Sequence, residues 1–256
     1  MTYKQNEIRS FVFTNKISLL GIMETKVRAA KSLKISRSIL RNWRFLYNND
    51  YHPNGRIWVA WDPSILDVKL EYASSQIMHT SVTIIEKNYS FLASFVYGFN
   101  TAHERTPLWR DIKYLSAGTT NIPWVLLGDF NVVRHPSERL GGDPTWHPYL
   151  NDFNTCCYDL SLDDLHYSGH HFTWSNKSPE DSLIASKLDR ALINVHWEST
   201  FSGSNASFLP PGVSDHCPTL VSTGVAISTH KSSFKFFNFW EDHPEFDSLI
   251  STAWST

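Results

Sequence analysis

The segment Trp124-Val-Leu-Leu-Gly-Asp-Phe-Asn131 joins an apolar run to two polar side chains. The apolar residues predict a buried strand that ends at Gly128. Asp129 and Asn131 then follow at its carboxyl end, where open α/β sheets bind ligands, and their spacing of two places both side chains on the same side of an extended chain. A carboxylate beside an amide suits an oxyanion substrate near a metal ion or a water molecule. A simple turn that closes the strand would use the same residue types.

Further polar side chains stand at or beside the ends of other apolar runs. They lie in four places: Met23-Glu24-Thr25, Tyr97, Ser186-Lys-Leu-Asp189-Arg190 and Ser214-Asp215-His216. Each is ordinary alone, because Glu24 would suit a surface position and Tyr97 a core position. Their coincidence at strand ends is what indicates one shared site.

Short apolar runs bounded by turn residues predict the strands that must position these side chains. The runs are Ile17–Met23, Arg56–Trp61, Leu66–Tyr72, Ile77–Ile85, Phe91–Tyr97, Trp124–Gly128, His170–Trp174 and Leu188–Ile193. Helical spacing predicts helices over residues 5–14, 106–115 and 150–160, the second with Thr106 as its cap and Pro107 as its first residue. A further helix is predicted over 243–254. Alternating strands and helices predict an α/β (α+β) fold.

Residues 25–49 carry basic side chains and no acidic one. At about 100° per residue, five of them fall on one face of a predicted helix over residues 26–44: Lys31, Lys34, Arg37, Arg41 and Arg44. This face is either the solvated side of an amphipathic surface helix or a stripe that follows nucleic-acid phosphates. We predict nucleic-acid binding for these five residues.

Composition limits the classes of protein that remain. The chain has 256 residues, a net charge of −2 and 41% apolar residues, which excludes a globally basic nucleic-acid binder and a wholly disordered chain. No apolar run approaches the roughly 20 residues of a membrane span, and the first residues lack a secretory signal. The three cysteines include no Cys-x-x-Cys pair. We therefore expect an intracellular protein, nuclear or cytoplasmic and not secreted, with no membrane partner.

The ordered set of motifs resembles the endonuclease/exonuclease/phosphatase superfamily. The matching residues are Glu24, Tyr97, Gly128-Asp129-Phe130-Asn131, Phe172-Thr173-Trp174, Ser186-Lys187-Leu188-Asp189-Arg190 and Ser214-Asp215-His216. Within the superfamily, the sequence is most similar to the apurinic-type endonuclease domain of plant LINE (non-LTR) retrotransposons. Glu-Arg-Leu-Gly-Gly at 138–142 and Leu-Asp-Arg-Ala-Leu-Ile-Asn at 188–194 are typical of that plant group. The resemblance covers residues 5–220.

The resemblance implies a four-layered sandwich of two mixed sheets with flanking helices, and a DNA-nicking enzyme that uses Mg²⁺ or Mn²⁺. It implies that Glu24 is the principal metal ligand and that Asp215 is a second acid near the metal. It assigns Asp129 to the attacking water, Asn131 and Tyr97 to the scissile phosphate, and His216, with Asp189 as its partner, to the developing charge. Thr173, Ser186 and Ser214 match secondary positions near the site.

The sequence departs from the family pattern at both ends. The family's first strand, which ends in Trp-Asn-x-Arg-Gly, has no match, so residues 1–223 are expected to form the domain without that strand. Residues 224–256 resemble a linker and aromatic tail that lead to a reverse transcriptase, the expected ancestral covalent partner. Two alternatives therefore stay open: an impaired remnant that binds nucleic acid through residues 26–44, and a phosphatase of the same superfamily. The oligomeric state is left open.

Overall fold

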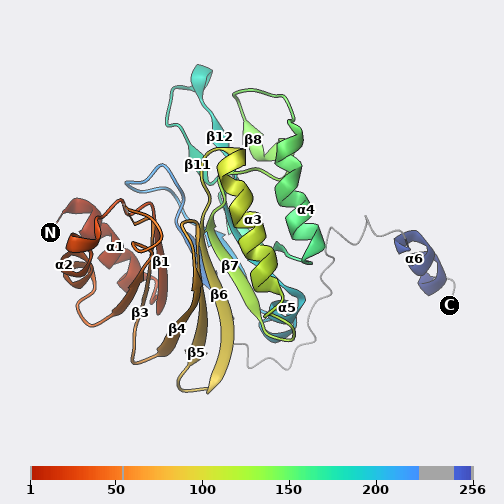
Figure 1. The fold of residues 1–256 in the computed structure, drawn as a ribbon. Helices are drawn as coiled ribbons and strands as arrows, with labels where there is room; N and C mark the ends of the chain where they lie inside the picture. The colour runs from red at the N-terminus through yellow and green to blue at the C-terminus, as the bar shows by residue number, and fades with distance from the viewer. Residues whose placement is uncertain (1, 54, 225–244, 255–256) are drawn as a thin grey trace.

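Two layers of β-structure form the centre of the molecule, and helices cover both outer faces (Figure 1). The computed structural model describes residues 2–53, 55–224 and 245–254. One layer is the six-stranded sheet β4-β5-β6-β7-β13-β9, and the other contains the three-stranded sheets β1-β3-β2 and β10-β14-β15. The predicted four-layered sandwich is confirmed.

The elements follow one another in short segments. The helices are α1 (Tyr3–Thr14), α2 (Ala29–Ile39), α3 (Ala102–Ser116), α4 (Asn151–Asp159), α5 (Val195–Thr200) and α6 (Phe246–Trp254), with 3₁₀ turns η1 (Pro136–Glu138), η2 (Pro148–Leu150) and η3 (Glu180–Ser182). The strands are β1 (Leu19–Met23), β2 (Arg44–Tyr47), β3 (Ile57–Trp61), β4 (Leu66–Ala73), β5 (Ile77–Ile84), β6 (Tyr89–Tyr97), β7 (Trp124–Asp129), β8 (Arg139–Leu140), β9 (Asp163–Asp164), β10 (Tyr167–Gly169), β11 (Trp174–Ser175), β12 (Ala185–Ser186), β13 (Asp189–Ile193), β14 (Asn205–Phe208) and β15 (Thr219–Ser222).

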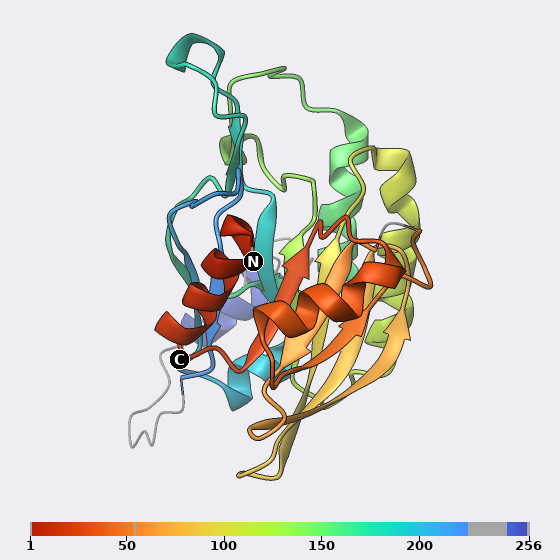
Figure 2. The same cartoon turned by 90° about the vertical axis from the view of Figure 1, so that its left-hand side faces the viewer.

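Three apolar clusters hold the layers together. One fills the space between the two β-layers and includes all-buried positions of β3 such as Ile57 and Val59. The second packs α3 and α4 on the outer face of β6 and β7, and the third packs α1 and α2 on Trp58 of β3. Figure 2 shows α1 and α2 lying across the strands that they cover. Because β3 is covered on both faces, it is apolar throughout rather than alternating.

Most of the predicted strands and helices are confirmed to within a few residues. The predicted strands Leu66–Tyr72 and Ile77–Ile85 correspond to β4 and β5, which pair antiparallel. The predicted strand His170–Trp174 is wrong. The chain leaves β10 at Gly169, where φ is +91° and a Cβ would collide with the Phe208 carbonyl oxygen. Pairing resumes only at Trp174 in β11.

The predicted start of the helix over residues 106–115 is also wrong. The helix α3 begins at Ala102, and Pro107 lies inside it. Thr101 is the N-cap, because its side chain accepts a hydrogen bond from the backbone N–H of Glu104 at 3.3 Å. This Thr-x-x-Glu capping pattern fixes the helix start one turn before the Thr-Pro pair.

The basic segment is not one helix. The helix α2 ends at Ile39, so Arg41 lies in a turn and Arg44 begins β2, opposite Trp61 of β3. Phe45 and Tyr47 of β2 stack edge-on against Trp58. This packing of aromatic side chains favours the extended chain over the helical period that the basic residues suggest.

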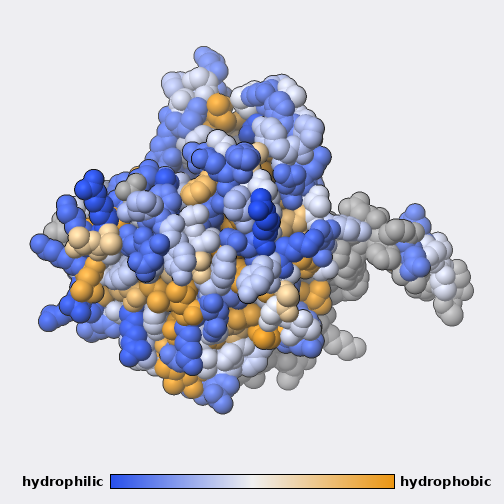
Figure 3. All heavy atoms as spheres, viewed as in Figure 1, coloured by the Kyte–Doolittle hydropathy of each residue, from blue (hydrophilic) through white to orange (hydrophobic). Residues whose placement is uncertain are grey.

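The surface agrees with this layering. Figure 3 shows apolar atoms mainly over the lower part of the molecule, where β4 and β5 lie, and a hydrophilic surface elsewhere on this face. Exposed apolar side chains there include Ile65, Leu70 and Ile85. Every helix of the described residues is too short or too polar to cross a bilayer. Of the predicted linker and aromatic tail, residues 225–244 and 255–256 lie outside the described residues. The predicted last helix is confirmed over 246–254 as α6.

Candidate active site

Strand register brings three of the predicted site residues side by side at one end of the six-stranded sheet. In the parallel pair β6–β7, Tyr97 lies opposite Asp129, and in the antiparallel pair β7–β13, Asp129 lies opposite Asp189. Side chains of directly opposed residues lie on the same face of a sheet. All three are buried, with exposed fractions of 4%, 4% and 8%. The sheet therefore presents a hydroxyl and two carboxylates in one row.

Asp129 is held rigidly by the residues around it. Its Oδ1 accepts the backbone N–H of Asn131 at 2.8 Å, and its Oδ2 accepts the Asn131 side-chain amide at 2.9 Å. The same amide donates to the Gly98 carbonyl oxygen at 2.8 Å. Gly128 has φ +138°, and a Cβ there would collide with the Val96 carbonyl oxygen. Glycine is therefore required at this position of β7, where the strand passes close to Val96 of β6.

His216 connects the two carboxylates. Its Nδ1 lies 2.8 Å from Oδ2 of Asp189, and its Nε2 lies 3.9 Å from Oδ2 of Asp129. Burial lowers the pKa of His216, but the hydrogen bond and charge of Asp189, followed by the charges of Asp129 and Asp215, raise it to about 9. Burial and the nearby Asp189 raise the pKa of Asp129 to about 7, against the opposing effect of His216 and Asn131. At neutral pH the imidazole is therefore cationic.

The predicted secondary residues support the backbone around the acids and the histidine. The Thr173 hydroxyl, fully buried, accepts the backbone N–H of Asp189 at 2.9 Å. The Ser214 hydroxyl accepts the backbone N–H of His216 at 3.1 Å. Ser186 is buried in the β11–β12 pair. These contacts make Thr173 and Ser214 positioning residues.

Glu24 lies on the other side of Tyr97. Its Oε1 accepts the Tyr97 hydroxyl at 2.9 Å, lies 2.9 Å from Lys26 Nζ and lies 3.9 Å from Arg56 Nη1. Burial raises the pKa of Glu24, but the hydrogen bonds from Lys26 and Tyr97, together with the charges of Lys26 and Arg56, lower it below its usual range. Glu24 also has φ +53°, a strained value for a residue with a side chain.

Asp215 is hydrogen-bonded to a tryptophan. Its Oδ2 accepts the Trp174 indole N–H at 3.0 Å. Among the described residues, the compact group of possible metal-ligating side chains is Asp129, Asp189 and His216, whose ligand atoms lie within 4.8 Å of one another. The two predicted ligands, Glu24 and Asp215, lie outside that group. Glu24 is connected to it by its hydrogen bond with Tyr97, which lies opposite Asp129 in the sheet.

The residues present fit a hard divalent cation. Such ions prefer carboxylate oxygens. Glu24 accepts the Tyr97 hydroxyl, and Tyr97 lies opposite Asp129 in the sheet. The contacts to Glu24 all involve Oε1, so Oε2 is available as a ligand in the described part of the chain. Glu24 would hold the ion through Oε2.

A buried ion network beside the site was not predicted. Arg190, fully buried next to Asp189, contacts Glu138 and lies 2.8 Å from Asp164. Lys187 Nζ lies 3.7 Å from the same Asp164. The network ties β13 to the segment before β8. Glu138 and Arg190 each lie in a quoted motif, but their pairing needs contacts that no sequence spacing reveals.

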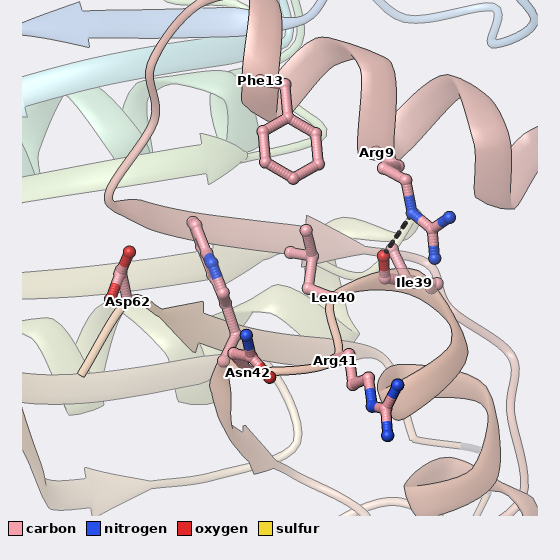
Figure 4. Close-up of a pocket in the computed structure, with 8 residues that line it drawn as sticks. Arg9, Phe13, Ile39, Leu40, Arg41, Asn42 and Asp62 are labelled. Atoms are coloured by element: carbon pink, nitrogen blue, oxygen red, sulfur yellow. Dashed lines mark hydrogen bonds between the residues drawn. The ribbon is translucent and has the colours of Figure 1, made fainter. Parts of the chain in front are cut away.

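The five predicted nucleic-acid-binding side chains are all exposed. They do not form one helical face, because only Lys31, Lys34 and Arg37 lie on α2. Arg41 lines a separate pocket of about 360 Å³ between α1 and the end of α2. There, Arg9 donates to the Ile39 carbonyl oxygen at 2.9 Å and so caps α2 (Figure 4).

Comparison with known proteins bears on the fold. No protein-family model matches the sequence, and no curated protein matches it significantly. Among solved structures, the endonuclease domain of TRAS1, a telomere-specific non-LTR retrotransposon, has a TM-score of 0.66 at 14% identity, covering 88% of this chain and 94% of that chain. A mannosyl-6-phosphatase from Bacteroides thetaiotaomicron has 0.55 at 15%, covering 85% and 89%. The human Nocturnin catalytic domain has 0.51 at 12%, covering 87% and 88%.

The chain therefore has the endonuclease/exonuclease/phosphatase fold, as its motifs predict. At these identities the similarity establishes the fold alone. The plant origin and the missing first strand stay predictions. Within the described residues, β1 pairs only with β3.

Proposed function

We propose that this chain cleaves phosphodiester bonds in DNA as a divalent-metal-dependent endonuclease of a LINE-type retroelement. The observation that carries the proposal is the cluster of Asp129, Asp189 and His216 at the end of the central sheet. Similarity to a retrotransposon endonuclease domain supports DNA as the substrate. A site that combines carboxylates, an imidazolium and a tyrosine hydroxyl suits hydrolysis of an anionic ester.

The side chains divide the chemistry between them. His216 donates through Nδ1 to Asp189, which leaves Nε2 to donate to a phosphate oxygen as negative charge develops there. The Asp129 carboxylate, held by Asn131, accepts a proton from the attacking water. The pKa of about 7 suits this role, because a base acts best near the working pH. Burial and Glu24 raise the pKa of Tyr97, which therefore stays a hydroxyl donor.

A divalent cation bound at this site would offset the charge of the phosphodiester and stabilise the leaving oxygen. Glu24 would supply a carboxylate ligand. Carboxylate oxygen donors favour Mg²⁺ or Mn²⁺ over soft metals.

Plasmid nicking tests the proposal. The protein is incubated with supercoiled plasmid and Mg²⁺, with and without EDTA. We expect Asp129→Asn and His216→Ala to lower the nicking rate by about 10²-fold or more, and EDTA to stop it. Asp67→Asn, which changes an exposed carboxylate on β4, is the matched control and keeps the rate. Equal nicking by Asp129→Asn would mean that the activity is a contaminant.

The same assay separates the two alternatives. Similarity to a mannosyl-6-phosphatase supports a phosphatase, and turnover of a soluble phosphomonoester without nicking would favour it. Exposed basic residues on α2 support an impaired binder, which predicts salt-dependent DNA binding without nicking.

A further inference from the structure

Arg56, which no motif of the sequence singles out, lies at the edge of the candidate site. Its backbone is fixed on both sides. The Asn48 side-chain oxygen accepts its N–H at 2.8 Å, and its carbonyl oxygen accepts the N–H of Thr25, the residue after Glu24, at 3.4 Å. Asn48 is itself fully buried. Arg56 therefore belongs to the rigid frame that also carries Glu24.

The guanidinium group of Arg56 is only partly used by its neighbours. Its Nη1 donates to the Tyr97 hydroxyl oxygen at 3.1 Å, and the group lies over the Tyr97 ring, 5.3 Å from the centroid. The 3.9 Å separation from Glu24 Oε1 is too long for a hydrogen bond. Its Nε is buried and has no partner among the described residues. A guanidinium has five N–H donors, so most of them lack an acceptor.

An arginine that served only to neutralise Glu24 would form a paired hydrogen bond with it. Instead, Lys26 and Tyr97 take the Glu24 oxygen, and Arg56 stays beside them with 24% of its side chain exposed. Two cations thus flank one carboxylate, which leaves excess positive charge on the Glu24 side of the site. A phosphate oxygen would satisfy the free donors of Arg56, because the planar fork matches phosphate geometry.

We propose that Arg56 is a substrate-binding residue that holds a phosphate group of the DNA strand against Tyr97. This inference rests on the proposed function, because it names a phosphate contact of the same site. Tyr97 then has two neighbours that orient its hydroxyl, Glu24 as acceptor and Arg56 as donor.

Salt-dependent binding of a short fluorescein-labelled DNA duplex tests the inference. Binding is measured by anisotropy in the full chain carrying Asp129→Asn, which prevents cleavage. Adding Arg56→Met is expected to weaken binding about tenfold or more and to lower the slope of log K against log salt by about one. Arg56→Lys, which keeps the charge, is expected to keep the slope. Arg110→Met, a change at an exposed arginine on α3, is the matched control and alters neither quantity.

A merely structural Arg56 would give a different result. Arg56→Met would then lower the melting temperature, while affinity and slope stayed at the parent values, and this outcome overturns the inference. If Arg56→Met does not fold, Arg56→Gln replaces it, since glutamine keeps a donor for Tyr97 but no charge. Nicking by the unmodified chain together with an unchanged slope overturns the role of Arg56 alone. Absence of both nicking and duplex binding in the unmodified chain overturns the proposed function as well.

Discussion

Two buried carboxylates on neighbouring strands, Asp129 and Asp189, have different partners and so different proposed roles. Asp129 is held by an amide and lies 3.9 Å from His216, whereas Asp189 is hydrogen-bonded to the imidazole at 2.8 Å. A carboxylate bonded to Nδ1 fixes the orientation of the ring and stabilises its charged form. Asp189 therefore acts through His216 rather than on the substrate.

Replacement of Asp189 tests this division. Asp189→Asn is expected to lower the pKa of His216 well below its present value of about 9, because Asp189 is the main cause of the rise. The pKa is measured by NMR titration of the imidazole protons in metal-free protein. Asp215→Asn is the matched control, since Asp215 contributes least of the three carboxylates. An unchanged His216 titration in Asp189→Asn would contradict the assignment.

Site residues at the ends of predicted strands can be identified from the sequence. Site residues that belong to loops or to another strand layer are harder to identify. Asp129 and Tyr97 are predictable, because several apolar runs end in polar residues and parallel strands end together. Arg56 and Lys26 are not, because their role depends on which loops meet across the two β-layers. The strained backbone of Glu24 is likewise invisible in the sequence.

At the scale of elements, the buried ion network fixes β13 beside the site. Arg190→Met leaves the carboxylate of Glu138 buried without its cationic partner, whereas the partly buried Asp164 keeps Arg134 and Lys187. Removing one member of a buried pair costs about 3–5 kcal/mol, so we expect a loss of that size in the free energy of unfolding measured with urea. The double variant Arg190→Met/Glu138→Gln should recover part of it. A loss below about 1 kcal/mol would mean that the network is solvated.

The β5 strand carries a buried histidine that makes stability depend on pH. His79 Nδ1 lies 2.7 Å from the Ser94 hydroxyl, and burial lowers the pKa of His79 to about 4. Between about pH 6.5 and pH 4 the unfolded chain binds a proton at this position and the folded chain does not, so stability falls as the pH drops. The difference in pKa corresponds to a loss of up to about 3 kcal/mol below pH 4.

Urea unfolding between pH 7 and pH 4.5 measures this effect. Relative to the unmodified chain, His79→Asn is expected to be destabilised at pH 7, where a packed ring is lost, and progressively less so at lower pH. His103→Asn, at an exposed position on α3, is the control and follows the unmodified chain. A destabilisation by His79→Asn that is constant with pH would show that His79 does not cause the pH dependence.

Helices and strands were predicted correctly where a single sequence pattern dominated. They were predicted wrongly where the spacing of charged residues and the packing of aromatic residues favoured different structures. The apolar runs of β6 and β7 have only one buried arrangement, and they were predicted correctly. Residues 41–44 continue a helical spacing of basic side chains, yet pairing of β2 with β3 and stacking on Trp58 outweigh it. Local charge spacing is a weaker constraint than burial of three aromatic rings.

At the scale of the whole molecule, the net charge of −2 combines regions of the molecule that carry different charges. The two buried carboxylates and the ion network lie beside the central sheet, whereas α2 presents exposed basic residues. Within the described residues, the salt bridges of lysine involve Lys26, Lys69, Lys113 and Lys187. Lys31 and Lys34 therefore keep their charge available for a partner. The helix follows Glu24 by only a few residues, so its basic surface begins next to the site.

This arrangement predicts that α2 extends DNA binding away from the site of cleavage. Lys34 and Arg37 lie three residues apart, about 4.5 Å along the helix axis, so they can contact neighbouring phosphates of one strand. Lys34→Gln/Arg37→Gln should lower the slope of log K against log salt by up to about two and should leave the nicking rate at saturating DNA unchanged, because neither side chain is part of the acid–histidine cluster. Lys69→Gln/Lys87→Gln, which changes one exposed lysine on β4 and one in the turn between β5 and β6, is the matched control. If the two double variants gave the same slope of log K against log salt, the basic residues of α2 would not bind DNA. Phosphate binding would then be confined to the candidate active site.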